Sequence, residues 1–274
     1  MGLYGPAYDA SDPSVSAVCR NRAAALRKYD WPVIDIAGSE TMLAGAATIN
    51  TVPTMFWVLY HVLPRRDLIQ RLRRELEPRL TRSDDGFVTV DVNSLNKTCP
   101  LLLSVYRETV RVANQLVSFR RVMEDTIISD GHGGSYVLKK GTDLQIAGSV
   151  LRGFQDIWGP DPTVFDPDRF TPERESAQTS DESKVRKAAY FPFGGGKHLC
   201  PGRNFAYLEI LATTCMVVSG FDVEPLDGEF AVVKAETPKF SAVVEKPVNN
   251  GAGYGVKISP RKGWENLGWR CEFR

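Results

Sequence analysis

A glycine- and proline-rich segment that ends in one cysteine constrains this chain more than any other feature. The segment covers residues 191–202, with Cys200 near its end, and a strongly apolar stretch follows over 203–219. The apolar stretch predicts a buried helix, so the segment delivers the thiol to a helix N-terminus. Backbone N–H groups and the helix dipole there favour the thiolate over the thiol. The glycines allow positive φ values and close approach of the backbone to a flat ligand.

Three other interpretations of this segment are weaker. A phosphate-binding loop requires G-x-x-x-x-G-K-[ST], whereas here His198 follows Lys197 and the first glycine is missing. Zinc requires three or four protein ligands, and only His198 and Cys200 are close in sequence. A buried free cysteine at a turn is the third. A thiolate at the end of such a loop can also be an axial ligand to haem iron, and this is the hypothesis we prefer.

Composition excludes several classes of protein. The chain has 274 residues, with 34 Lys+Arg against 33 Asp+Glu and 43% hydrophobic residues. These values exclude wholesale disorder and argue against a strongly basic nucleic-acid binder, so no nucleic-acid partner is predicted. The five cysteines include no Cys-x-x-Cys pair, which argues against a disulfide framework and favours a reducing compartment.

Hydrophobic periodicity predicts a mainly helical chain with small sheets and no internal repeats. Helices are predicted over residues 20–29, 36–63, 65–80, 100–112 and 203–219. Strand patterns are predicted at 87–92, in a hairpin of 136–138 with 143–146, and in short strands over 225–274. The polar segment 171–187 is predicted to be an exposed loop.

The stretch over residues 41–64 carries no formal charge and is long enough to span a bilayer. Asn50, Pro53, His61 and four threonines lie within it and disfavour insertion. We interpret it as a long helix buried in a helical protein, with a membrane span as the alternative. The start of the chain, residues 1–6, shows neither a signal pattern nor an apolar anchor.

The cysteine segment resembles the ligand loop of the cytochrome P450 family, which reads F-x-x-G-x-[HR]-x-C-x-G. Its positions are filled by Phe193, Gly196, His198, Cys200 and Gly202. The resemblance implies the C-terminal half of the cytochrome P450 fold: a long central helix, an E-x-x-R helix, the cysteine-ligand loop and the helix that follows it. It covers nearly the whole chain, so residues 1–274 are predicted to be one partial domain.

The resemblance implies haem b as the cofactor, with the Cys200 thiolate as the proximal ligand to iron. It implies that His198 binds a haem propionate and that Phe193 packs near the haem and the cysteine sulfur. Arg120 lies where the family often places a second arginine that binds a propionate. Arg121 is its neighbour, which leaves the register open.

Two further motifs resemble those of the family and occur in the expected order. Glu108-Thr-Val-Arg111 matches E-x-x-R, and at this spacing both side chains share one helix face and can pair. The segment 165–170 resembles the family's later arginine motif and supplies Arg169. The resemblance implies that Glu108, Arg111 and Arg169 form a buried triad that braces the cysteine loop.

The long helix resembles the helix that crosses the haem, where the family signature is A-G-x-[DE]-T. Residues 44–48 fit one register, and residues 47–51 fit a second that makes Asn50 and Thr51 the catalytic pair. We prefer the second, because residues 50–57 resemble the N-T-x-P-x-x-F-W of the cholesterol 7α-hydroxylase and prostacyclin synthase branch. Pro53 lacks an N–H, so the helix is predicted to kink beside a polar notch suited to proton delivery. A kinked core helix without such a notch is the alternative.

The resemblance implies a haem-thiolate monooxygenase that uses O2, an apolar small molecule and electrons from NADPH–cytochrome P450 reductase. The substrate is expected to be a secondary metabolite or a sterol- or fatty-acid-like molecule, and the source fungal. A haem-thiolate isomerase or dehydratase and a truncated non-catalytic remnant are the alternatives. Members of this family normally sit on the endoplasmic reticulum through an anchor in the other half of the fold. Without that half, exposed apolar patches are predicted.

Overall fold

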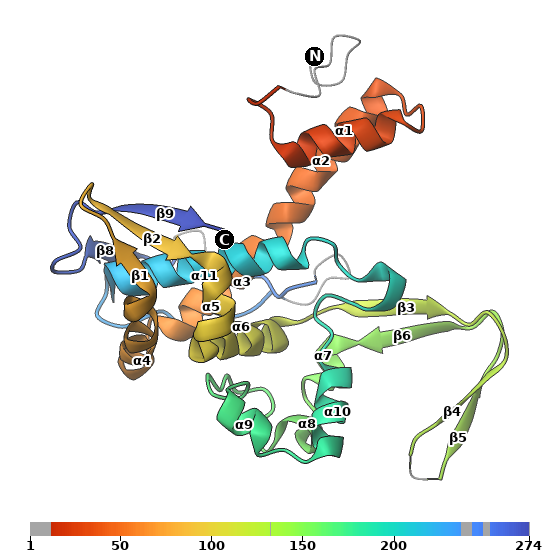
Figure 1. Cartoon of the computed structure of the whole chain (residues 1–274). Helices are drawn as coiled ribbons and strands as arrows, with labels where there is room; N and C mark the ends of the chain where they lie inside the picture. Colours follow the sequence, from red (N-terminus) through yellow and green to blue (C-terminus); the bar gives the residue numbers. More distant parts are fainter. Residues whose placement is uncertain (1–11, 132, 237–242, 249–252, 274) are drawn as a thin grey trace. The chain divides into compact units, whose positions relative to one another are not determined.

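The computed structural model describes residues 12–131, 133–236, 243–248 and 253–273 (Figure 1). The chain divides into two compact units, Met1–Asn50 and Thr51–Arg274, each described here by itself. The expectations for residues 1–6 lie outside the described residues.

The first unit contains two helices, α1 (Ala17–Arg27) and α2 (Val33–Ile49). Pro32 precedes α2 in an extended conformation, which separates the two helices. The Arg22 guanidinium joins them through an ion pair with Glu40, with 2.9 Å between Nε and Oε1.

The uncharged stretch of residues 41–64 forms parts of two helices rather than one continuous helix. α2 ends at Ile49, and α3 (Thr51–Val62) begins after Asn50. Pro53 cannot donate to the carbonyl of Ile49, and its ring crowds that carbonyl. The interruption therefore lies where the sequence predicts a kink.

The two helices differ in burial. In α2 the one buried residue is Ile36, and Ile34 and Met42 are exposed. In α3 several side chains are buried, among them Trp57. The prediction of a long buried helix is therefore confirmed for α3 and wrong for α2. By length and composition alone, Val33–Val62 is long and apolar enough to cross a membrane.

Five helices of the second unit share one hydrophobic core. They are α3, α4 (Arg66–Leu76), α5 (Val92–Thr98), α6 (Pro100–Ala113) and α11 (Arg203–Gly220). Leucines at helical spacing give α4 its apolar face, and all three are almost fully buried: Leu68, Leu72 and Leu76. The predicted helix 65–80 ends early, because Pro78 falls in the 3₁₀ turn Glu77–Arg79 that follows α4.

The strands of the second unit form small sheets. β2 pairs antiparallel with β1 and parallel with β9 in one sheet: β1 (Leu80–Arg82), β2 (Phe87–Asp91) and β9 (Gly268–Glu272). The other pairs are antiparallel: β3 (Val117–Arg121) with β6 (Asp143–Ala147), β4 (Thr126–Ser129) with β5 (Ser135–Leu138), and β7 (Phe221–Pro225) with β8 (Val256–Pro260).

The predicted hairpin of residues 136–138 with 143–146 is wrong. β5 pairs with β4, and β6 pairs with β3, so the two segments have different partners. Gly141 does occupy a turn with a positive φ of 86°. The glycine signals a turn, but the partner of each strand depends on the ladder formed with an earlier segment.

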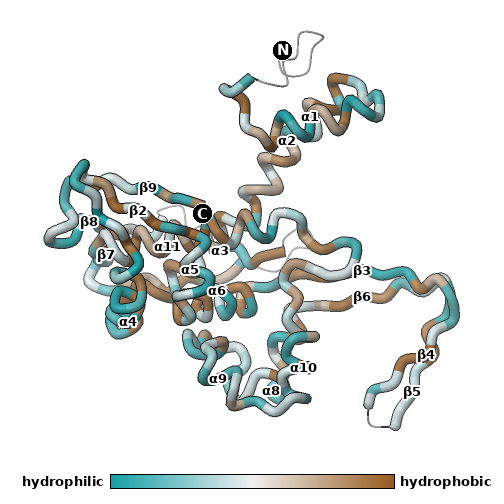
Figure 2. Tube along the Cα trace, in the orientation of Figure 1, coloured by the Kyte–Doolittle hydropathy of each residue, from teal (hydrophilic) through white to brown (hydrophobic). Residues whose placement is uncertain are grey.

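The prediction of a loop over residues 171–187 is also wrong in part. This exposed, largely hydrophilic segment contains α9 (Pro172–Ser176) and most of α10 (Ser180–Ala189) (Figure 2). A capping box between Thr179 and Glu182 starts α10. Two further short helices precede them, α7 (Gly148–Leu151) and α8 (Gln155–Trp158). The predicted fold class, mainly helical with small sheets, is confirmed.

Candidate functional site

A buried carboxylate in α6 brings two arginines together. Glu108 is fully buried, and its Oε2 lies 2.7 Å from Nε of Arg111, one helical turn later. Glu108 Oε1 also accepts a hydrogen bond from Arg111 Nη2 at 2.8 Å and one from Arg169 Nε at 2.9 Å. The three residues expected to form a triad are therefore in direct contact. Charge-assisted bonds of this kind offset the cost of burying the charges.

The remaining donors of the two arginines also have partners. Arg111 Nη1 donates to the carbonyl of Arg152 at 3.1 Å, and its guanidinium lies 4.8 Å from the ring centroid of Trp158. Arg169 donates to the carbonyls of Trp158 and Asp161. The triad is thus a satisfied network that joins α6 to the segment 158–169.

The cysteine loop is closed by its own backbone. The Cys200 N–H donates to the carbonyl of Phe193 at 3.0 Å, and the Gly194 N–H donates to the carbonyl of Phe191 at 3.0 Å. Gly194 and Gly196 have φ values of 73° and 60°, a conformation that glycine adopts without strain. These two positions explain why the loop needs glycine.

The thiol lies directly before α11. Gly202 is the N-cap residue of α11, and the Arg203 guanidinium donates to the carbonyl of Cys200 at 3.0 Å. A Cβ atom at Gly202 would lie 4.0 Å from Cys200 Sγ, so the backbone passes close to the sulfur. The 18-residue helix α11 begins three residues after Cys200.

Two other thiols are unsuited to the same chemistry. Cys99 and Cys215 are buried in the core, and burial raises the pKa of Cys99 to about 11 and that of Cys215 to about 12. Both therefore stay protonated at neutral pH. Cys200 is only partly buried.

The structure distinguishes the two candidate arginines in β3. Arg120 Nη2 donates to the carbonyl of Gly195 in the cysteine loop at 2.8 Å. Arg121 is exposed and pairs with Asp143 at 3.4 Å. The exposed side chain of His198 lies in the 3₁₀ turn Gly196–His198 of the same loop.

The donor set fits haem iron better than a bare metal ion. In the part of the chain that the structure describes, no three His, Cys, Asp or Glu residues are grouped so as to hold a metal. Cys200 can supply one ligand, and a porphyrin would supply the equatorial ones. Arg120 and His198 add donors beside the loop that suit propionate carboxylates. Cys200, Arg120 and His198 therefore fit a haem group.

Three contacts that the motifs do not reveal connect the triad to the loop. The ring of Phe170, next to Arg169, packs 5.3 Å from the ring of Tyr190, which directly precedes the loop. Tyr190 Oη donates to the carbonyl of Arg107 in α6 at 3.3 Å, and the Arg107 guanidinium lies 4.3 Å from the Phe170 ring centroid. The signal in the sequence is the pair of aromatic residues Phe170, which ends the segment 165–170, and Tyr190, which directly precedes the cysteine loop.

The comparisons with known proteins identify the family. A model of the cytochrome P450 family matches residues 32–250. The chain belongs to the cytochrome P450 family. The expected resemblance is therefore confirmed.

Two fungal cytochromes P450 are among the proteins that this chain resembles. A cytochrome P450 monooxygenase of Gibberella zeae is 39% identical over 263 residues, covering 94% of this chain and 50% of the relative. Cytochrome P450 monooxygenase nodJ of Hypoxylon pulicicidum is 31% identical, covering 88% of this chain and 46% of the relative. Cytochrome P450 7A1 of Oryctolagus cuniculus is 26% identical, covering 80% of this chain and 45% of the relative.

A solved structure shows the same fold. The crystal structure of a cytochrome P450 (CYP102L1) matches with a TM-score of 0.63 and 21% sequence identity, covering 84% of this chain and 47% of that structure. The chain spans about half the length of the curated relatives that it matches.

The two residues of the predicted catalytic pair of this cytochrome P450 are neighbours in the chain, where α2 ends and α3 begins. Asn50 follows the last residue of α2 and is partly buried, with φ −109° and ψ −32°. Thr51 is the first residue of α3 and is buried. Their role in proton delivery stays a prediction.

A partly buried histidine of α3 predicts acid sensitivity of this cytochrome P450. His61 stacks on Phe165, with ring centroids 4.2 Å apart, and burial together with the Arg65 charge lowers its pKa to about 4. Between pH 6.5 and pH 4 the unfolded chain binds a proton at this histidine while the folded chain does not. We expect the free energy of unfolding to fall by roughly 3 kcal/mol across that range.

Urea unfolding at several pH values measures this loss. The variant His61→Phe keeps a ring against Phe165 and should lose most of the pH dependence in that window. An equally steep pH dependence in the variant would contradict the assignment to His61.

Proposed function

We propose that this chain forms the haem-binding half of a monooxygenase that inserts one oxygen atom of O2 into an apolar small molecule. The observation that carries the proposal is the Cys200 thiol at the start of α11, in a loop that accepts a hydrogen bond from Arg120. Both fungal relatives described above bear the name monooxygenase. Residues 1–274 would form one partial cytochrome P450 domain.

The residues of the loop have distinct proposed roles. Cys200 ligates the iron of haem b, while His198 and Arg120 bind the propionates. Gly196 and Gly202 allow close approach of the backbone, and the Phe193 ring shields the sulfur. Phe193 is partly buried against the core, which supports that last role. Bound there, the haem would supply O2 activation, with the thiolate favouring O–O cleavage.

The pair Asn50 and Thr51 is proposed to hold and pass protons. The interruption of the helix beside Pro53 supports this, since a broken helical turn leaves backbone groups able to bind water or O2. Retention of Thr51 favours oxygen activation over the isomerase or dehydratase alternative.

Partners and location follow from the family. Cytochromes P450 generally use redox-partner reductases, and we propose NADPH–cytochrome P450 reductase for this chain. We propose the endoplasmic reticulum membrane as the location, with membrane association through the other half of the fold. The similarity to fungal relatives and to cytochrome P450 7A1 supports a secondary-metabolite or sterol-like substrate.

A reduced carbon-monoxide difference spectrum of the full chain after haem reconstitution tests the proposal. We expect the red-shifted Soret band of a thiolate-ligated haem. A band typical of a neutral thiol or histidine ligand, or no band, would favour the non-catalytic alternative. Turnover with NADPH and reductase supports the monooxygenase, whereas turnover of a peroxide without NADPH supports the isomerase.

A further inference from the structure

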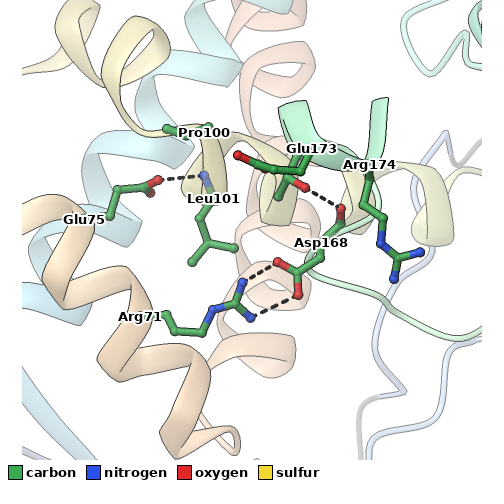
Figure 3. A pocket seen from close by; sticks show the side chains of 8 residues that line it. Arg71, Glu75, Pro100, Leu101, Asp168, Glu173 and Arg174 are labelled. Carbon is green, nitrogen blue, oxygen red and sulfur yellow. Dashed lines mark hydrogen bonds and ion pairs between the residues drawn. The ribbon is translucent and has the colours of Figure 1, made fainter. Parts of the chain in front are cut away.

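Helix α4 contacts two segments that meet at Glu108. One is the first turn of α6, and the other is the turn of residues 166–171. Arg71 and Glu75 stand one helical turn apart on α4, so they share a face. Figure 3 shows Glu75 beside Leu101 at the start of α6 and Arg71 below it, with the Arg71 guanidinium pointing toward Asp168. Arg71 and Glu75 both line an open pocket of about 580 Å³, together with Leu101 and Asp168.

Glu75 holds the first turn of α6. Its two carboxylate oxygens accept hydrogen bonds from the N–H groups of Leu101 and Leu102, at 2.8 and 2.9 Å. These N–H groups have no partner within the helix, so the carboxylate serves as a cap supplied by another element. Glu108 lies on the same helix two turns further on.

Arg71 holds the turn that presents Arg169. Both of its terminal nitrogens donate to the carboxylate of Asp168, one of them at 3.0 Å, which is a bidentate pair. Asp168 directly precedes Arg169, and its backbone carbonyl accepts the Thr171 N–H at 3.1 Å. In the same turn, the Asp166 N–H donates to Glu108 Oε1 at 3.1 Å.

The turn also reaches the cysteine loop. Phe170 lies two residues after Asp168, and its N–H donates to the hydroxyl of Ser104 in α6 at 3.0 Å. Its ring packs against Tyr190, the residue before the loop. A displacement of the turn would therefore change the support under Tyr190.

We propose that Arg71 and Asp168 are positioning residues for the cysteine loop: their ion pair fixes the turn of residues 166–171, and Phe170 in this turn holds Tyr190 at the start of the loop. The proposal rests on the proposed function, because it gives the pair a role in placing the iron ligand. Arg71 lies outside the motifs that define the site, and Asp168 lies within the segment 165–170, directly before Arg169.

Hydrogen exchange of the haem-free full chain tests the positioning without relying on haem. The variants are Arg71→Ala, Asp168→Asn and the double variant, read by mass spectrometry on peptides covering 190–200. The pair is partly exposed, with side-chain exposures of 37% and 32%, so its contribution is modest. We expect each single variant to speed loop exchange about fivefold, which corresponds to about 1 kcal/mol.

The double variant should exchange no faster than either single variant, because each change removes the same interaction. The matched control is Arg74→Ala on the same helix, whose Nε donates to the carbonyl of Gln70 in α4 itself; it should leave loop exchange unchanged. Arg71→Lys keeps the charge but not the bidentate geometry and should give an intermediate rate.

Unchanged loop exchange in the single variants, or multiplied effects in the double variant, would overturn the proposal. Equal acceleration in a peptide covering β2 would also overturn it, because this indicates general destabilisation. In haem-reconstituted chains, the fraction with a thiolate band should fall in the single variants. A wild-type chain without that band would count against the proposed function and leave the exchange result intact.

Discussion

Replacement of Cys200 by serine is expected to abolish the thiolate Soret band of the haem-reconstituted chain. A serine hydroxyl stays protonated at neutral pH and cannot donate electron density to iron as a thiolate does. Cys99 and Cys215 cannot replace it, because both are buried in the core with raised pKa values. The reduced carbon-monoxide difference spectrum measures the loss, which we expect to be complete.

The matched control is Cys271→Ser, which changes an exposed thiol in β9. It should keep the thiolate band. Because Cys200 is only partly buried, Cys200→Ser should also leave the cooperative unfolding of the haem-free chain intact. An unchanged band in Cys200→Ser would refute the assignment of the ligand.

The largest loss of stability is expected from Glu108→Gln. This change keeps the size of the side chain but leaves Arg111 and Arg169 without their counter-charge in a buried network. Removal of one partner from a buried ion pair typically costs about 3–5 kcal/mol. That is a large part of the stability of a typical protein, so the variant should unfold at much lower urea concentration.

Asp143→Asn is the control for the loss of a carboxylate charge. Asp143 pairs with Arg121, and both side chains are more than 60% exposed, so the change should cost less than about 0.5 kcal/mol. If Glu108→Gln and Asp143→Asn shift the urea midpoint equally, the ion pairs of the triad do not stabilise the fold.

The sequence predicts best where contacts are local. Glu108 and Arg111 are one helical turn apart, and the loop from Phe193 to Cys200 closes on itself, so spacing alone suggests both geometries. The capping box of Thr179 and Glu182 is equally local, and it is a signal for α10 within a segment that the polar composition suggests is a loop.

Prediction fails where the partner is distant. The bidentate pair of Arg71 and Asp168 joins positions 97 residues apart, and no spacing rule connects them. The short strands β5 and β6 look like a hairpin because of Gly141, yet β6 pairs with the more distant β3, and β5 forms a local hairpin with β4 instead. Exposure of α2 is missed for a related reason, since an apolar composition shows that a helix can be buried but not what covers it.

The parallel pairing of β2 with β9 has a consequence for synthesis on the ribosome. Phe87 pairs with Gly268, so β2 leaves the ribosome 181 residues before its partner. At about 5–20 residues per second, this delay lasts roughly 10 to 35 s. During that time one edge of β2 has no ladder partner, and such an edge can pair with another chain. Nascent chains of this protein should therefore depend on chaperones until residues 268–272 emerge.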